Sequence, residues 1–580
     1  MRPVRFLLDI PKRGLGELTT LTVTNGKPFR LRDGGGPQAW VQDANHVIEA
    51  GRFGIVVGYL FAKGTGQRIA RLPVEILHGR DAFGIAEWLT HECWGAYCAL
   101  LADGPTIHVY SDPSELLPVY CVQDAEHWHC ASDVALLGVC SFGKPQVSFP
   151  ALTAHLQRPE WRGPRTCLAG VDELPSGHVT SFGHMATQSV ALWQLSHFMP
   201  GRSSRSFAEF ARQLRDTAQT VMRAWSSVAG RVLVSASGGV DSSLIAAALG
   251  ATHRDFACLT VATVDPSGDE RETVRDLARH LGVEIFEARY DASKVDLANA
   301  ASLGLPRPTG KAFMKDVRWA AGEAARSLGA SAVFDGNGGD NLFCYLHSAV
   351  PILDRWRCEG LCRGTAETLL DMCQITQVTI PAMLRATIAR SRRGIRPPAW
   401  PADVRLLASE IGDSNVVAML EELARSIPSN HPGKKNHLDL LLRTQNFIHP
   451  AAGNADPLQF SPLMSQPLVE LCLSIPTWIW CQGGINRALA RAAFAQDLPS
   501  SIVRRVSKAG PDSAMRDIFI QNHALIRDML FGGLLMSNGL LDAAAIEQAL
   551  MADPHGDDPV IYRLLDLVEA EAWARSWQGT

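Results

Sequence analysis

One stretch, residues 231–250, constrains the fold of this chain more than any other. Its first part, residues 231–236, is short and rich in β-branched residues, which predicts a buried strand. Its last part, residues 244–249, contains strong helix formers that Gly250 can close. Between them stands Ser-Gly-Gly-Val-Asp-Ser-Ser at 237–243. The stretch therefore predicts a strand, a tight glycine turn and a helix whose first N–H groups lie above the end of the strand.

The predicted turn is suited to binding phosphate. Unpaired N–H donors and the positive end of the helix both favour an anion, and the hydroxyls of Ser237, Ser242 and Ser243 add donors. Asp241 supplies a hard oxygen that could hold Mg²⁺ between phosphates. No Gly-x-x-x-x-Gly-Lys-Ser/Thr sequence occurs, which excludes a Walker loop. The alternative is a serine-rich turn without a ligand.

Composition limits the range of functions. A chain of 580 residues is too long for one core, so two or three domains are expected. The formal net charge of −4 shows no bias towards nucleic acid. No segment has the roughly 18 uninterrupted apolar residues of a membrane span, and the first residues lack a signal-peptide core. The 13 cysteines include no Cys-x-x-Cys pair, and Cys358, Cys362 and Cys373 have no histidine nearby in sequence. Thiols in a reducing cytoplasm are therefore expected rather than a metal site.

The residues after the glycine turn alternate between strand and helix patterns. Residues 256–263 predict a second strand, 273–281 an amphipathic helix and 283–286 a third strand. Alternation of this kind predicts an α/β fold with a doubly wound parallel sheet, whose ligand lies at the carboxyl ends of the strands.

A second glycine-rich loop follows a predicted strand within residues 332–343. Three glycines there permit close approach of the backbone to a ligand. Asp340 is a second candidate metal ligand beside Asp241. A plain glycine loop is the alternative.

The N-terminal third carries short apolar runs separated by glycine, proline and aspartate, which predicts a layered β-rich domain. The order of its motifs resembles the glutamine-amidotransferase domain of the asparagine synthetases. The counterparts of that domain's motifs lie at 95–99, 111–113, 118–120, 130–133 and 174–178. The resemblance implies an Ntn-type αββα glutaminase-like sandwich over residues 1–195.

One departure from this resemblance concerns the nucleophile. The glutaminase needs a cysteine at the mature N-terminus, whose thiolate attacks and whose α-amine acts as base. Arg2 occupies position 2 here, and the first cysteine is Cys93. We therefore expect an inactive domain, kept as a scaffold, that neither hydrolyses glutamine nor delivers ammonia.

The Ser-Gly-Gly-x-Asp-Ser sequence is the signature loop of the ATP pyrophosphatases, and the later motifs resemble the synthetase domain of the asparagine synthetases. The resemblance implies an adenylating ATP-pyrophosphatase domain over residues 205–580, with a helical C-terminal portion, that uses ATP and Mg²⁺. It implies metal ligands at Asp241 and Asp340. It implies nucleotide contacts at Ser235, Ser237, Gly238, Gly239, Asp241, Ser242, Val261, Asp335 and Gly336.

Two further segments refine the resemblance. Gly-Gly-Asp-Asn at 338–341 departs from the asparagine synthetases and looks closer to the lasso peptide cyclases of the same superfamily. Lys508 occupies the position of a lysine that the family brings into its synthetase site, where an ammonium would neutralise the acyl-adenylate phosphate and the oxyanion. The segment that reads aspartate in the asparagine synthetases is replaced at 449–457, so a pocket for free aspartate is not expected.

The resemblance implies a lasso peptide cyclase, an ATP-dependent ligase that forms a macrolactam. Such an enzyme adenylates an Asp or Glu side chain of a precursor peptide, and the N-terminal amine of that peptide then attacks and expels AMP. The implied partners are the precursor peptide, a leader-binding protein and a leader protease, with no nucleic acid and no membrane. The alternatives are a β-lactam synthetase-like or ammonia-dependent asparagine synthetase-like ligase, and a nucleotide-binding regulator built on a dead synthetase.

Overall fold

The structure is a computed structural model. It describes residues 3–12, 22–25, 36–140, 143–183, 187–199, 205–252, 255–263, 265, 269–392, 402–408, 431–448, 457–505, 510–554 and 559–579. Within these ranges no helix combines the length and the apolar character needed to cross a membrane.

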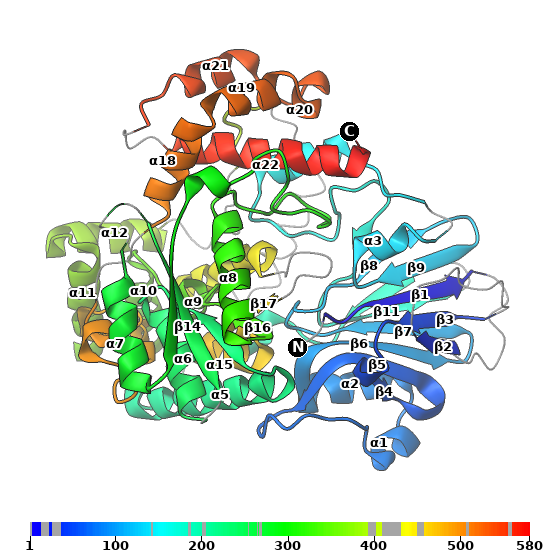
Figure 1. Cartoon of the computed structure of the whole chain (residues 1–580). Helices are drawn as coiled ribbons and strands as arrows, with labels where there is room; N and C mark the ends of the chain where they lie inside the picture. Colours follow the sequence, from blue (N-terminus) through cyan, green and yellow to red (C-terminus); the bar gives the residue numbers. More distant parts are fainter. Residues whose placement is uncertain are drawn as a thin grey trace.

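The N-terminal third forms two six-stranded sheets (Figure 1). Their strands are β1 (Phe6–Pro11), β2 (Thr22–Asn25), β3 (Gln38–Val41), β4 (Val47–Glu49), β5 (Gly54–Ala62), β6 (Cys93–Asp103), β7 (Thr106–Ser111), β8 (Tyr120–Gln123), β9 (His127–Ala131), β10 (Asp172–Glu173), β11 (His178–Phe182) and β12 (Thr187–Ala191). The first sheet has the order β10-β8-β9-β1-β3-β2 and the second the order β12-β11-β7-β6-β5-β4.

Alternating side chains build four layers from these two sheets. Leu8 of β1 and Val57 of β5 belong to one buried cluster, so the two sheets pack face to face. Leu7 of β1 points the other way, into a cluster shared with α3 (Val134–Leu137) and α4 (Phe149–Gln157). The outer face of the second sheet is covered by α1 (Val74–Gly79) and α2 (Ala82–Glu92). The order is helix, sheet, sheet, helix; the likeness to a glutaminase and its inactivity stay predictions.

The C-terminal part is built on a five-stranded sheet in which every pair is parallel. Its strands are β13 (Val232–Ser235), β14 (Phe256–Ala262), β15 (Glu284–Arg289), β16 (Ala332–Phe334) and β17 (Leu458–Phe460), in the order β15-β14-β13-β16-β17. One face of this sheet is covered by α5 (Phe207–Val228), α6 (Val240–Gly250) and α7 (Arg271–Leu281), and the other by α8 (Met314–Leu328).

The strand and helix predictions for residues 231–286 are confirmed, with shifted ends. The third strand extends to Arg289, and the helix predicted at 273–281 begins at Arg271. α6 ends at Gly250, where the sequence predicted its end, and the C-cap residue Ala251 keeps a right-handed helical conformation. Gly250 is therefore the last helical residue and not a left-handed glycine beyond the C-cap.

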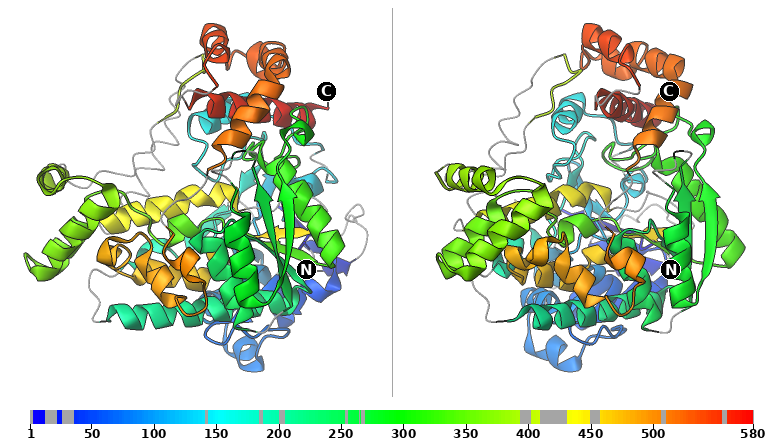
Figure 2. Two further views of the ribbon diagram at one scale, coloured as in Figure 1. Left: turned by 60° about the vertical axis from the view of Figure 1, so that its left-hand side comes forward. Right: turned by 90° about the vertical axis from the view of Figure 1, so that its left-hand side faces the viewer.

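The remaining helices lie between β16 and β17 in the sequence or follow β17. They are α9 (Gly339–Leu342), α10 (Val350–Glu359), α11 (Arg363–Thr376), α12 (Ile380–Arg392), α14 (Pro432–Thr444), α15 (Gln466–Ser474), α16 (Ala488–Ala493), α17 (Ser500–Val503), α18 (Asp512–Gln521), α19 (His523–Phe531), α20 (Leu534–Ser537), α21 (Ala543–Leu550) and α22 (Val560–Gln578). The last five group together at one end of the molecule (Figure 2). Within this group the buried carboxylates of Glu569 and Glu571 on α22 accept N–H bonds from Ser302 and Leu535.

All 13 cysteines are free thiols, as expected from their spacing. Although no histidine lies near Cys358 in the sequence, the fold brings one to it: Sγ of Cys358 lies 3.1 Å from Nε2 of His431. The two residues are 73 positions apart, so the contact depends on the packing of α10 against the start of α14 and leaves no local pattern.

Trp225 of α5 joins the two halves of the chain. Its indole ring is fully buried between Phe61 of β5, at 5.0 Å between ring centroids, and Phe460 of β17, at 4.3 Å. Its Nε1–H donates to Oγ of Ser465 over 2.8 Å. Because apolar residues of both halves belong to the same buried cluster, the core is continuous from the sandwich to the parallel sheet.

We expect Trp225→Ala to destabilise both halves together by about 3–5 kcal/mol, since it leaves a large cavity where they meet. Chemical denaturation can be monitored by hydrogen exchange. We expect the amides of the sandwich and of the parallel sheet to lose their protection from exchange in one transition. Trp319→Ala on α8 is the control: this ring is 51% exposed, and its loss should cost less than about 1 kcal/mol. Loss of protection confined to one half would contradict a shared core.

Candidate active site

The glycine turn between β13 and α6 has the geometry that its sequence predicts. Gly238 has φ +63°, in the left-handed region that favours glycine, and a Cβ there would lie 2.7 Å from a guanidinium nitrogen of Arg505. Gly239 is the N-cap of α6, and no side chain of a described residue caps the first turn. The hydroxyl of Ser242 accepts the N–H of Ser237 over 3.1 Å. The turn is thus held by its own serine, and the helix keeps an uncapped N-terminus that suits an anion.

The second glycine loop packs directly against this turn. It follows β16, the parallel neighbour of β13, so both loops leave the carboxyl ends of adjacent strands. A Cβ at Gly336 would lie 3.0 Å from the backbone nitrogen of Ser242, and one at Gly339 would overlap the side chain of Asp241. The close approach of the two loops therefore disfavours any side chain at Gly339, and a Cβ at Gly336 would make a tight contact that the neighbouring backbone must accommodate.

The two predicted metal ligands meet at one guanidinium group. Nη1 of Arg487 donates to Oδ2 of Asp241 over 2.8 Å and also contacts Oδ1 of Asp340. Arg487 is 6% exposed, has φ +54° and lies over the ring of Tyr345. Sequence reasoning gave Arg487 no role, because its contact with Asp241 spans 246 residues.

The donor set fits a magnesium ion that is shared with phosphate. Asp241 and Asp340 both lie within reach of one cationic group, and carboxylate oxygen is the ligand that Mg²⁺ prefers. No group of three or more His, Cys, Asp or Glu side chains that could hold a metal occurs in the described ranges. Two carboxylates leave most of an octahedral shell open, so phosphate oxygens and water would complete it.

The other predicted nucleotide contacts lie around the same turn. Ser235 and Val261 are half-buried at the carboxyl ends of β13 and β14, and Ser237 is exposed. The side chain of Ser243 is fully buried, and its Oγ makes no hydrogen bond with any described residue, so its expected role as a donor to phosphate stays a prediction. Lys508 lies outside the described residues.

Asp335 supports the second loop through its side chain. Its Oδ1 accepts the hydroxyl of Ser461 over 2.7 Å and the N–H of Asn337 over 3.1 Å. Burial raises the pKa of this carboxyl group to about 6. That oxygen of Asp335 is therefore engaged in holding the loop.

Two more arginines connect the segments that lead towards Lys508. Arg491 donates to the carbonyl of Val503 over 2.8 Å, and Arg505 pairs with Glu270 at 2.6 Å. Burial lowers the pKa of Arg491 to about 10. Sequence reasoning assigned neither residue to the site, although the Arg-Arg pair at 504–505 just before Lys508 was a usable signal.

A model of the asparagine synthase family matches residues 209–433 and 460–575. No curated protein matches the chain. Among solved structures, the allosteric regulatory enzyme of purine biosynthesis is 14% identical with a TM-score of 0.14, and the match covers 36% of this chain and 49% of that chain. Glutamine phosphoribosylpyrophosphate amidotransferase from B. subtilis, complexed with ADP and GMP, is 12% identical with a TM-score of 0.17, over 49% of this chain and 71% of that chain. The chain thus spans about half the length of the first structure, and similarity at this level says nothing about activity.

Removing the guanidinium should expose the two carboxylates to metal. We expect Arg487→Gln to bind Mn²⁺ at least about tenfold more tightly than wild type without nucleotide, because a cation no longer competes for Asp241 and Asp340. Titration calorimetry measures this. The control is Arg527→Gln, which removes an exposed pair with Glu547. Equal affinities in a folded Arg487 variant would show that the guanidinium does not compete with the ion.

Asp335 should make stability depend on pH. Its folded-state pKa of about 6 lies above the ordinary 3.8, so its contribution to stability is fully present below about 4 and is lost as the pH rises through 6. Asp335→Asn keeps the accepting Oδ1 and should remove this slope, worth roughly 3 kcal/mol. The free energy of unfolding in urea, measured at pH 4, 5, 6 and 7 for the wild type and the variant, tests this. Asp528→Asn, at an exposed position, should leave the slope unchanged.

Proposed function

Because the chain belongs to the asparagine synthase family, we propose that its site activates a carboxylate of a peptide as an acyl-adenylate and joins it to the N-terminal amine of the same peptide. The family match covers more than half of the chain and supports an ATP-using amide ligase. The peptide substrate, the AMP-forming route and the need for Mg²⁺ are the proposed parts.

One observation carries this proposal: Asp241 and Asp340 converge at the N-terminus of α6. They come from two interlocked loops at the carboxyl ends of adjacent parallel strands, where open α/β sheets bind their ligands. An anion-binding helix end beside two acceptor carboxylates suits a triphosphate with a divalent ion. A bound Mg²⁺ would supply neutralisation of the phosphate charge.

The reaction balances without any further reagent. The substrate carboxylate attacks the α-phosphorus of ATP, an acyl–phosphate bond forms, and the bond to pyrophosphate breaks. The amine then attacks the acyl carbon, the new C–N bond forms, AMP leaves with the former carboxylate oxygen, and the amine releases a proton. Uncapped N–H groups of α6 would stabilise the growing phosphate charge. Lys508 is the proposed cation at the acyl carbon.

Ring closure is favoured when both reacting groups belong to one chain. Holding them together gives effective concentrations on the order of 10⁵ M or more, so no separate amine donor is needed. The Gly-Gly-Asp-Asn loop at 338–341, with its likeness to lasso peptide cyclases, supports the peptide over free aspartate. A leader-binding protein, a leader protease and a cytoplasmic location belong to the same proposal.

The test supplies ATP, Mg²⁺ and leaderless peptides bearing one Asp or Glu. We expect AMP, pyrophosphate and a peptide lighter by one water, as seen by intact mass. Asp241→Asn should abolish pyrophosphate release. Lys508→Ala should fold and bind ATP but cyclise 10²–10³-fold more slowly, at the typical cost of about 3–4 kcal/mol for one lost donor.

Matched variants separate charge from geometry. Lys508→Arg keeps the charge on a larger planar group and should rescue poorly. Lys294→Ala is the control, since this ammonium lies over the ring of Trp319, on α8. Asparagine formed from aspartate and ammonia, with every peptide left linear, would overturn the proposal in favour of the synthetase-like alternative.

A further inference from the structure

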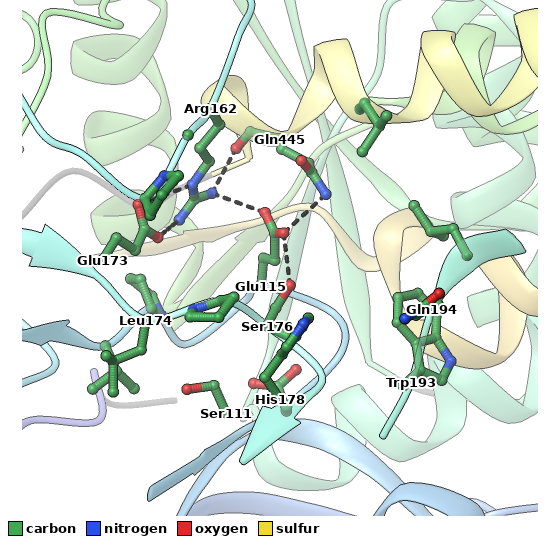
Figure 3. Close-up of a pocket in the computed structure, with 18 of the residues that line it drawn as sticks. Ser111, Glu115, Arg162, Glu173, Leu174, Ser176, His178, Trp193, Gln194 and Gln445 are labelled. Atoms are coloured by element: carbon green, nitrogen blue, oxygen red, sulfur yellow. Dashed lines mark hydrogen bonds and ion pairs between the residues drawn. The ribbon is translucent and has the colours of Figure 1, made fainter. Parts of the chain in front are cut away.

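A cavity of about 570 Å³ lies between the N-terminal sandwich and α14, apart from the glycine loops (Figure 3). Much of its lining is apolar, from both halves of the chain: Leu117, Trp161, Leu174, Trp193, Leu438 and Leu442. Volume, apolar walls and a position between two structural units are the properties of ligand pockets in general.

The cavity opens beside two sheet edges. Glu173 belongs to β10, the last strand at one end of the first sheet, and Ser189 to β12, the last strand at one end of the second. β12 pairs with β11 on one side only, as far as the described residues show, and its residues 187–190 are exposed. An edge strand presents backbone N–H and C=O groups that an extended chain can pair with.

The charges beside the cavity cancel one another. Arg162 contacts Glu173, and its Nη1 lies 3.3 Å from Oε2 of Glu115 (Figure 3). Nη1 of Arg307 lies 2.7 Å from Oε2 of Glu173. Although burial disfavours a charged guanidinium, the two carboxylates hold the pKa of Arg162 above its usual value. Two arginines and two glutamates sum to zero charge, so this wall favours a neutral ligand over an ion.

Two more titratable groups face the cavity. Asp112 is buried, which raises its pKa to about 7, and it accepts N–H bonds from Ser114 over 2.8 Å and from Tyr97 over 3.2 Å. His178 uses Nδ1 in a 2.8 Å hydrogen bond with the carbonyl of Ser176. Their polar atoms are largely engaged with the protein, which leaves little charge directed at a ligand.

A hydroxyl group in the lining has no hydrogen-bond partner among the residues that the structure describes. It belongs to Ser111, which is 3% exposed and whose Oγ is buried. A buried hydroxyl without a partner costs free energy, and a carbonyl oxygen of a ligand would satisfy it. The cavity thus offers a wall without net charge, a hydroxyl donor and a sheet edge. These features suit an uncharged peptide.

We propose that this cavity binds an extended segment of the peptide substrate, with an aromatic or large aliphatic side chain inside and the peptide backbone along β12. The identity of the peptide as substrate rests on the function proposed above. The binding step itself needs neither ATP nor the carboxylates of Asp241 and Asp340.

The position of α14 connects this pocket with the glycine loops. Leu438, Leu442 and Gln445 line the cavity, whereas Nε2 of His437 hydrogen-bonds to the carbonyl of Leu342, next to the loop of Asp340, over 2.8 Å. One helix, about 10 Å thick, therefore separates the pocket from the second loop. An extended peptide covers that distance in about three residues. The held side chain should lie at least that far from the reacting group.

The test uses two labelled probes of defined sequence, acetyl-Thr-Val-Trp-Val-Thr-amide and the same peptide with Asp in place of Trp. Fluorescence polarisation measures affinity, and hydrogen exchange locates the bound peptide. We expect the Trp probe to bind at least tenfold more tightly than the Asp probe and to protect β12. Equal affinities, no binding up to about 1 mM or protection elsewhere would overturn the proposal.

Variants on β12 provide the matched pair. Ser189→Trp fills the cavity from an exposed strand and should weaken Trp-probe binding at least tenfold. Gln188→Trp points to the opposite face of the strand and should not. Ser111→Ala should weaken binding about threefold to tenfold. Unchanged binding in a folded Ser189→Trp variant would contradict the site.

The two proposals can fail separately. Asp241→Asn should bind the Trp probe like wild type while losing pyrophosphate release. A chain that cyclises peptides but never binds the probe would overturn the pocket and leave the function. A chain that binds the probe at β12 but adenylates no peptide would overturn the function and leave the pocket.

Discussion

The contact between Gly339 and Asp241 is the constraint on which the candidate site depends. A parallel sheet brings the ends of β13 and β16 together, and a side chain at Gly339 would displace the side chain of Asp241. The glycine lets Asp241 keep the position in which it shares one guanidinium nitrogen with Asp340. The site therefore depends on glycine in the second loop as well as on the two carboxylates.

Local sequence patterns predicted the parts of the site that depend on local structure. The strand, turn and helix at 231–250 follow from β-branched residues, paired glycines and helix formers, all of which act within a few residues. The same reasoning placed Asp241 and Asp340 at strand ends, where parallel sheets bring side chains together. It did not show that the side chain of Ser243 is fully buried, because a turn sequence does not reveal which hydroxyls the next helical turn buries.

The residues that sequence reasoning missed act over long separations. Arg487 reaches Asp241 across 246 positions, and Arg307 reaches Glu173 across 134. Neither contact has a spacing that a period of two or 3.6 residues could indicate. The cavity beside β12 was missed for a similar reason, since its walls come from strands, loops and α14. The Asp335 side chain shows the converse: a carboxylate in a suggestive motif is engaged by Ser461, which lies 126 residues away.

The burial of Trp225 bears on why such a chain keeps its N-terminal sandwich. One face of α5 packs on the parallel sheet while its indole ring lies against β5 and β6 of the sandwich. A ligase that started at α5 would present this ring, with Val221 and Ala218, as an open apolar patch to water. A sandwich that had lost its own chemistry would still be held by selection for solubility. Residues of the sandwich that once took part in chemistry could then change, while the residues that cover Trp225 would stay apolar.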